Sequence, residues 1–161
     1  WQQNRIYKEI VKTLFGNVAD KKIGVLGFAF KENTNDTRES PAIQLCKNLI
    51  NEGAYLSIHD FKVSKETISK DLDPKIINKI KNFDSSNLEW EYHEDIYSCL
   101  KKTSSVILLT ECEDYKKIDW ERISKNVKLP FWIFDTRSIV NVDQCQKFGL
   151  NVWQLGNGSK I

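Results

Sequence analysis

The sequence contains no methionine, only three prolines and seven glycines, and only two histidines in 161 residues. Its four cysteines are dispersed, without C-x-x-C spacing or a neighbouring histidine-rich segment, which disfavours a zinc site and a disulfide framework. No apolar run approaches the ~20 residues that span a bilayer. The formal net charge is +2 and the lysines are scattered, a pattern that argues against nucleic-acid binding.

What remains is the composition of an ordinary globular protein. Apolar residues make up 40% of the chain and charged residues 29%, and 161 residues can bury a sizeable core within a single domain. The chain begins at Trp1 and lacks an initiator methionine, so we expect it to be a piece of a larger protein. Dispersed cysteines and the absence of a visible signal peptide favour a reducing, cytoplasmic location.

Helix-like and strand-like segments alternate along the chain. Helices are predicted over residues 4–15, 41–52, 74–81, 94–101, 119–126 and 142–148, and strands over residues 23–30, 55–60, 88–92, 105–110, 131–135 and 151–155. The alternation predicts βαβ units and thus an α/β fold, a three-layer Rossmann-like sandwich with a mainly parallel sheet. The rest of residues 61–87 is expected to be loop, and residues 156–158 a frayed tail.

The segment of residues 23–43 is the most informative part of the sequence. It begins as an apolar strand and continues as a polar loop that carries Lys31 and Arg38. Ser40 followed by Pro41 is typical of an N-cap and the first turn of a helix. A strand, a charged loop and a helix N-terminus in this order predict an anion site at the carboxyl edge of the sheet.

Two cations follow buried strands and are the first candidates for a binding site. Lys31 comes directly after the first strand, and Arg137 shortly after the strand of residues 131–135. Because ligands of an open parallel sheet bind beyond the carboxyl ends of its strands, we interpret both as functional. The structural alternatives are a solvated lysine and an ion pair of Arg137 with Asp135. Phe30 could stack on a base or a sugar, or could simply complete the core.

Arg38 has two interpretations of nearly equal weight. It lies just before a helix N-terminus, where it could hold an anion together with free backbone N–H groups. It could equally form an ion pair with Asp36 or Glu39.

Asp60 ends the second strand, where dinucleotide-binding proteins hold a ribose, but the glycine-rich fingerprint after the first strand is absent. We therefore interpret Asp60 as a residue that stabilises a loop.

The other chemistry-bearing residues are interpreted as structural. His59 and His93 are lone histidines without the partners of a catalytic triad. No cysteine has the glycine-rich or basic context that marks a nucleophile. No catalytic residue and no metal ligand is therefore predicted in this chain.

The loop after the first strand resembles that of a known enzyme family. Its consecutive pieces are Gly27-Phe28-Ala29-Phe30-Lys31, Asn33-Thr34 and Asp36-Thr37-Arg38-Glu39-Ser40-Pro41-Ala42. In this order they resemble the C-terminal, UDP-sugar-binding domain of the UDP-glucose 6-dehydrogenase family, and the resemblance extends over residues 1–155. Residues 131–137 resemble the last core strand and arginine loop of that domain, and Thr110-Glu111 stands where the family carries a Thr-Glu pair.

The resemblance implies an oxidoreductase that converts UDP-glucose to UDP-glucuronate with two NAD. In that family an N-terminal Rossmann domain binds NAD and a central helix supports dimerisation, so the expected partners are UDP-glucose, NAD, that N-terminal domain and further copies in a homo-oligomer. Residues 1–16 would be the end of the connector helix and residues 17–161 the UDP-sugar-binding domain. The catalytic cysteine lies outside this part, so the fragment alone would be inactive.

The resemblance also implies roles for individual residues. Phe30 and Lys31 match the pair that contacts the UDP-sugar, Arg137 matches an arginine that also contacts this substrate, and Arg38 matches an arginine that reaches NAD. The family often has glycine in place of Thr136 and tryptophan in place of Cys112, and the first departure bears on the loop that holds Arg137.

Two alternatives stay open. One is a non-catalytic nucleotide-binding or oligomerisation module of similar α/β architecture. The other is a related nucleotide-sugar dehydrogenase that acts on GDP-mannose or UDP-N-acetylmannosamine, although Phe28 and the Thr37-Arg38 pair favour the UDP-glucose branch.

Overall fold

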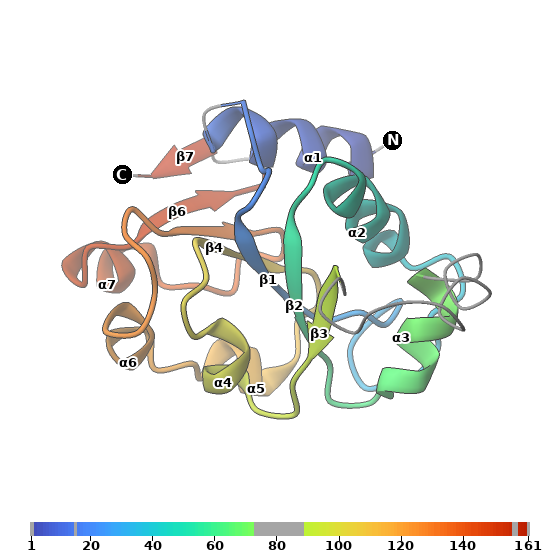
Figure 1. Ribbon diagram of the computed structural model, residues 1–161. Helices are drawn as coiled ribbons and strands as arrows, with labels where there is room; N and C mark the ends of the chain where they lie inside the picture. The colour runs from blue at the N-terminus through green and yellow to red at the C-terminus, as the bar shows by residue number, and fades with distance from the viewer. Residues whose placement is uncertain (1, 15, 73–88, 156–157, 161) are drawn as a thin grey trace.

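The strands form one sheet that runs through the middle of the molecule (Figure 1). The computed structural model describes residues 2–14, 16–72, 89–155 and 158–160. Its strands are β1 (Lys22–Leu26), β2 (Tyr55–His59), β3 (Trp90–Tyr92), β4 (Ser105–Leu108), β5 (Trp132–Asp135), β6 (Asn151–Gln154) and β7 (Gly158–Lys160). Its helices are α1 (Gln2–Thr13), α2 (Pro41–Asn51), α3 (Lys65–Leu72), α4 (Ile96–Leu100), α5 (Glu113–Lys116), α6 (Trp120–Ser124) and α7 (Val142–Lys147).

The strand order is β3-β2-β1-β4-β5-β6-β7. The first six strands are parallel, and β7 pairs with β6 in the antiparallel direction. From β1 the chain moves outward through β2 to β3, then returns to β4 on the other side of β1 and moves outward in the opposite direction. The carboxyl ends of β1 and β4 are therefore the topological switch point, and the predicted mainly parallel α/β sandwich is confirmed.

Helices cover both faces of the sheet. Helices α1, α2 and α3 lie on one face, and α4, α5, α6 and α7 on the other (Figure 1). In β4, Ile107 joins the core on the first face, whereas Val106 and Leu108 join the core on the second. Because side chains alternate between two buried faces, an uninterrupted apolar run is needed in this strand.

Local signals fix the start of α2 next to the carboxyl end of β1. The Ser40 hydroxyl accepts the N–H of Ala42 as an N-cap, and Pro41 occupies the first turn, as predicted. The same hydroxyl donates to the carbonyl of Phe28 at 2.7 Å. Ser40 therefore ties the helix N-terminus to the loop that leaves β1.

Helix α1 packs on the sheet. Its buried residues Ile6 and Ile10 share a core with Trp132 and Trp153 of β5 and β6. This helix therefore covers the part of the first face that α2 and α3 leave open, over the second half of the sheet. Among the described residues, no helix combines the length and the apolar character needed to cross a membrane.

Several predicted bounds differ from the structure. Strand β1 ends at Leu26 rather than at residue 30, because Gly27 has a φ of +96° and turns the chain away from the sheet. Helices α3 and α5 were not predicted, and Gly158 belongs to β7 rather than to a frayed tail. The predicted helix of residues 74–81 lies outside the described residues.

Candidate functional site

Asp60 at the end of β2 holds the start of the loop that follows β1. Its Oδ2 accepts the N–H groups of Phe28 and Ala29 at 2.7 and 3.0 Å. Its Oδ1 accepts those of Lys62 and Val63 at 2.7 and 3.0 Å. The carboxylate is buried and fully engaged with backbone donors. The interpretation of Asp60 as a residue that stabilises a loop is confirmed.

The β1–α2 loop closes on itself and exposes Phe30. The Phe30 N–H donates to the carbonyl of Asp36 at 2.8 Å, and the Asp36 N–H donates to Thr34 Oγ1 at 3.1 Å. Phe30 is 47% exposed, so the alternative that it completes the core is wrong. It borders an open hollow of about 280 Å³ together with Asp36, Arg38 and Glu39. Two of the four predicted site residues, Phe30 and Arg38, therefore lie together.

Arg38 forms the ion pair with Asp36 that the sequence allowed. Its Nε donates to Oδ1 at 3.0 Å and its Nη2 to Oδ2 at 2.9 Å, a bidentate arrangement. These hydrogen bonds hold the pKa of Asp36 at about 2. The Arg38 side chain is 88% exposed, so the rest of its guanidinium faces solvent.

Arg137, by contrast, turns away from the aspartate that precedes it. Its Nε donates to the carbonyl of Leu109 at 3.0 Å, and its Nη1 lies 4.0 Å from a carboxylate oxygen of Glu111. The expected alternative, an ion pair with Asp135, is wrong: of Arg137, only the backbone N–H donates to Asp135, at 3.1 Å. Arg137 is thus anchored by a main-chain group at the end of β4.

The reason lies in the surroundings of Asp135. This carboxylate is completely buried, and its Oδ2 accepts the Val140 N–H and the Gln154 amide, both at 2.9 Å. Its hydrogen-bonding capacity is taken by groups that close the β5–α7 loop and fix the end of β6. The guanidinium of Arg137 therefore has to find a partner outside its own turn.

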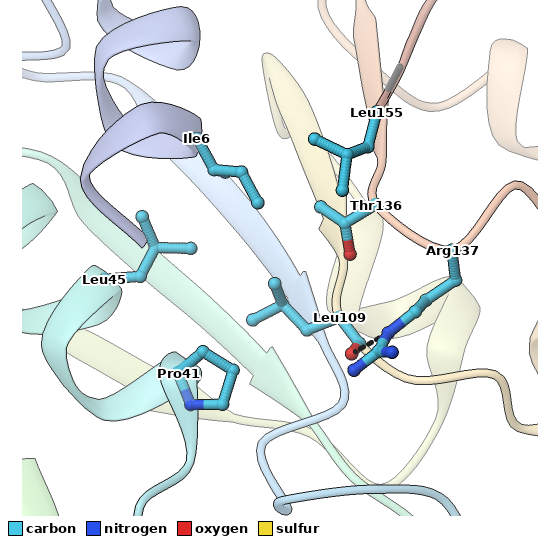
Figure 2. Close-up of a pocket in the computed structure, with 7 residues that line it drawn as sticks. All are labelled: Ile6, Pro41, Leu45, Leu109, Thr136, Arg137 and Leu155. Atoms are coloured by element: carbon cyan, nitrogen blue, oxygen red, sulfur yellow. Dashed lines mark hydrogen bonds between the residues drawn. The ribbon is translucent and has the colours of Figure 1, made fainter. Parts of the chain in front are cut away.

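Arg137 forms one wall of a hollow of about 290 Å³ at the carboxyl edge of the sheet. Figure 2 shows α1 and α2 on one side of the hollow, the ends of β5 and β6 on the other side, and the end of β4 between them. The residues that line the hollow are Ile6, Pro41, Leu45, Leu109, Thr136, Arg137 and Leu155. The Thr136 hydroxyl donates to the carbonyl of Leu108 at 2.6 Å. A guanidinium beside apolar side chains such as Ile6 and Leu109 can bind an anionic group whose attached carbon skeleton contacts the apolar wall.

Lys31 lies at the same edge of the sheet but lines a different, narrow crevice. Thr110, Cys112 and Tyr115 contribute to that crevice. Arg137 contacts Leu109 and approaches Glu111 in the same segment. Residues 109–112 therefore stand between the two predicted substrate-binding cations, which share this segment but border separate hollows.

His59 and three of the four cysteines have structural environments. His59 is buried, its Nδ1 lies 2.8 Å from the Tyr115 hydroxyl, and burial lowers the pKa of its imidazole. Burial raises the pKa values of three thiols, those of Cys46, Cys99 and Cys145, to about 12. No group of His, Cys, Asp and Glu residues within the described part of the chain is arranged to hold a metal ion.

Fold and site together define the class of the protein. It is a doubly wound α/β domain with a cationic hollow beside the switch point of its sheet, the place where ligands of such domains bind. Residues 24–142 match the family model described as "UDP-glucose/GDP-mannose dehydrogenase family, UDP binding domain". The chain belongs to this family.

Curated relatives agree with the family assignment. The chain is 36% identical to UDP-glucose 6-dehydrogenase 3 of Arabidopsis thaliana, in an alignment covering 97% of this chain and 34% of the relative. It is 37% identical to the UDP-glucose 6-dehydrogenase of Drosophila melanogaster, over 97% of this chain and 32% of the relative. The chain therefore spans about a third of the length of these relatives.

Solved structures share the fold. One is the NDP-N-acetyl-D-galactosaminuronic acid dehydrogenase from Methanosarcina mazei Go1, with a TM-score of 0.70, 16% identity and coverage of 98% of this chain and 29% of that one. Another is a UDP-glucose dehydrogenase from Pyrobaculum islandicum, with a TM-score of 0.62, 21% identity and coverage of 92% and 28%. At these identities the likeness concerns the fold alone.

Proposed function

We propose that the chain is the UDP-sugar-binding domain of a UDP-glucose 6-dehydrogenase, which oxidises UDP-glucose to UDP-glucuronate with two NAD. The family assignment and the names of the relatives support this proposal. The observation that carries it is Arg137, whose Nε is fixed by the Leu109 carbonyl while the guanidinium borders a hollow beside the switch point. A fixed guanidinium suits a diphosphate better than a mobile point charge does.

In this proposal Arg137 and Lys31 bind the substrate from separate hollows on the two sides of residues 109–112. The Arg137 Nη groups form no hydrogen bond within the described residues, and the Glu111 carboxylate at 4.0 Å is too distant to occupy them. They are free to bind a phosphate oxygen of the UDP-sugar. Lys31 supplies a second, mobile cation from the other side of residues 109–112, and the exposed ring of Phe30 offers a contact surface.

The cofactor would be held mainly outside this chain. NAD is the hydride acceptor of the reaction. The chain lacks the glycine-rich turn with which a Rossmann unit binds a dinucleotide. Asp60, which stands at the ribose position of such units, is already occupied by four backbone N–H groups. Arg38, exposed on the β1–α2 loop, would reach NAD held by the N-terminal domain of the same enzyme.

The remaining features of the proposal concern the whole enzyme. Residues 1–16 would end a central connector helix, and residues 17–161 would form the domain that closes over the substrate. The enzyme would be a cytoplasmic homo-oligomer, and its catalytic cysteine would come from outside this chain. The fragment alone would then bind UDP-sugar and transfer no hydride.

Steady-state kinetics of the full-length enzyme test this proposal. We expect Arg137→Ala and Lys31→Ala each to raise the KM for UDP-glucose about 10- to 100-fold, as loss of a charge-assisted hydrogen bond does. The matched controls are Arg122→Ala and Lys125→Ala on and beside α6, which remove the same charges away from both hollows. Unchanged KM values would refute the residue assignment. Preferred oxidation of GDP-mannose or UDP-N-acetylmannosamine would refute the choice of sugar, and no oxidation at all would favour a non-catalytic module.

A further inference from the structure

Asp36 connects the two exposed site residues of the β1–α2 loop. Its backbone carbonyl accepts the Phe30 N–H at 2.8 Å. Its carboxylate Oδ1 accepts both the backbone N–H and the Nε–H of Arg38 at 3.0 Å, and its Oδ2 accepts from Nη2 at 2.9 Å. One residue thus fixes the loop at Phe30 and the side chain at Arg38.

The ion pair leaves part of the guanidinium available. An arginine has five N–H donors in a planar fork, and Asp36 uses the edge formed by Nε and Nη2. Nη1 forms no hydrogen bond within the described residues, and the side chain is 88% exposed. The second edge, formed by Nη1 and the other Nη2 hydrogen, therefore faces solvent in a defined orientation. Such an edge binds a phosphate in a bidentate manner.

We infer that Asp36 is a positioning residue, which presents the free edge of the Arg38 guanidinium to a phosphate group of the dinucleotide. The inference rests on the proposed function, in which Arg38 contacts NAD. From the sequence alone, an ion pair of Arg38 with Asp36 and a role of Arg38 in ligand binding were alternative interpretations. In the structure they are compatible, because the pair occupies one edge and the ligand takes the other.

Two opposing effects decide what Asp36 contributes. An exposed arginine without a partner samples many rotamers. A ligand that binds it must restrict the side chain to one rotamer, and this loss of conformational entropy lowers the affinity for the ligand about tenfold. The carboxylate of Asp36 also repels an approaching anion, but solvent screens a repulsion between exposed charges. We expect the ordering effect to prevail, so loss of the carboxylate weakens NAD binding even though it removes a negative charge.

The experiment measures the KM for NAD in the full-length enzyme at saturating UDP-glucose. Asp36→Asn retains an acceptor for the Arg38 backbone N–H, but its amide nitrogen cannot accept from Nη2. We expect the KM for NAD to rise about tenfold, with kcat and the KM for UDP-glucose changed less than about twofold. The Phe30 N–H bonds to a backbone carbonyl, which the substitution leaves in place.

A double-mutant cycle shows whether Asp36 acts through Arg38. In an Arg38→Ala background, Asp36→Asn is expected to have no further effect on the KM for NAD. Additive effects, or an equal rise in the KM for UDP-glucose, would overturn the inference in favour of a general role in loop structure.

Glu39→Gln is the matched charge control. Glu39 carries the same charge on the same loop and acts on Arg38 through that charge, but among the described contacts it forms no hydrogen bond with Arg38. We expect this variant to lower the KM for NAD slightly, because it removes a negative charge near Arg38 without removing a hydrogen bond. The effect is opposite in sign to that of Asp36→Asn. Equal rises in both variants would overturn the inference while the proposed function stands. A wild-type enzyme that does not oxidise UDP-glucose with NAD would instead refute the proposed function, and the inference with it.

Discussion

Arg38 and Arg137 follow the same kind of backbone turn, but their side chains bond to different partners. Each follows Asp-Thr, and each donates its backbone N–H to the aspartate two residues earlier, at 3.0 and 3.1 Å. Asp36 is partly exposed and also accepts the side chain of its arginine, whereas Asp135 is buried and bonded elsewhere. The burial of the aspartate thus decides whether the arginine folds back or extends to a new partner.

This difference predicts unequal effects of the same substitution. Asp135→Asn leaves the Val140 N–H and the Gln154 amide facing a nitrogen donor in a buried site. We expect it to lower the free energy of unfolding by about 2–4 kcal/mol, measured by urea denaturation. Asp36→Asn should change this free energy little, because the Asp36–Arg38 pair is solvated. Equal losses in the two variants would contradict the account.

Gly27 is required at the end of β1 for two separate reasons. Its φ of +96° disfavours a side chain, and a Cβ there would clash with the side chain of Thr110. Gly149, with a φ of +79° and nothing within 4 Å of a Cβ, shares only the first reason. We expect Gly27→Ala to destabilise the chain by about 1–3 kcal/mol more than Gly149→Ala does, measured by thermal or urea unfolding. If Gly27→Ala lowered the free energy of unfolding no more than Gly149→Ala does, the ends of β1 and β4 would have to move apart easily, which would contradict the account.

The buried His59 predicts a pH dependence of stability. Burial lowers the pKa of its imidazole, so between that pKa and the unfolded value of about 6.5 the unfolded chain binds the proton more readily. The free energy of unfolding should therefore fall as the pH is lowered from 7 to 5. In His59→Gln the slope over this interval should be shallower. An unchanged slope would assign the effect to other groups.

The cysteines should differ in reactivity. Burial raises the pKa values of Cys46, Cys99 and Cys145 to about 12, whereas Cys112 is only partly buried. At pH 8 in native buffer, a thiol reagent such as DTNB should therefore modify one thiol rapidly and the other three only after unfolding. Cys112→Ser should abolish the rapid phase. Rapid reaction of more than one thiol would indicate that the core opens readily.

Much of the fold could be predicted because its strands carry strong apolar signals. Strand β4 is buried at every position, and Ser40 and Pro41 mark the start of α2 unambiguously. Helix α3 could not be predicted, because of its eight residues only Ile68 and Leu72 are buried and the rest of its sequence is polar. Strand β7 carries no apolar alternation, and its pairing with β6 depends on backbone hydrogen bonds.

The site could be predicted only in part. The strand-end cations and the Asp36–Arg38 pair could be predicted, because both depend only on residue type and on position relative to a strand or to a neighbour in the sequence. The hollow beside Arg137 was not, because Ile6, Leu45 and Leu155 come from distant parts of the sequence and have the apolar character of ordinary core residues. The anchor of Arg137 is a backbone carbonyl, that of Leu109, which no side-chain pattern reveals.

The most direct test of the central proposal is a crystal structure of the full-length protein with UDP-glucose bound. We expect a diphosphate oxygen within hydrogen-bond distance of the Arg137 guanidinium, with Lys31 approaching from the other side of residues 109–112. UDP-glucose bound elsewhere, with the hollow beside Arg137 left empty, would contradict the proposal.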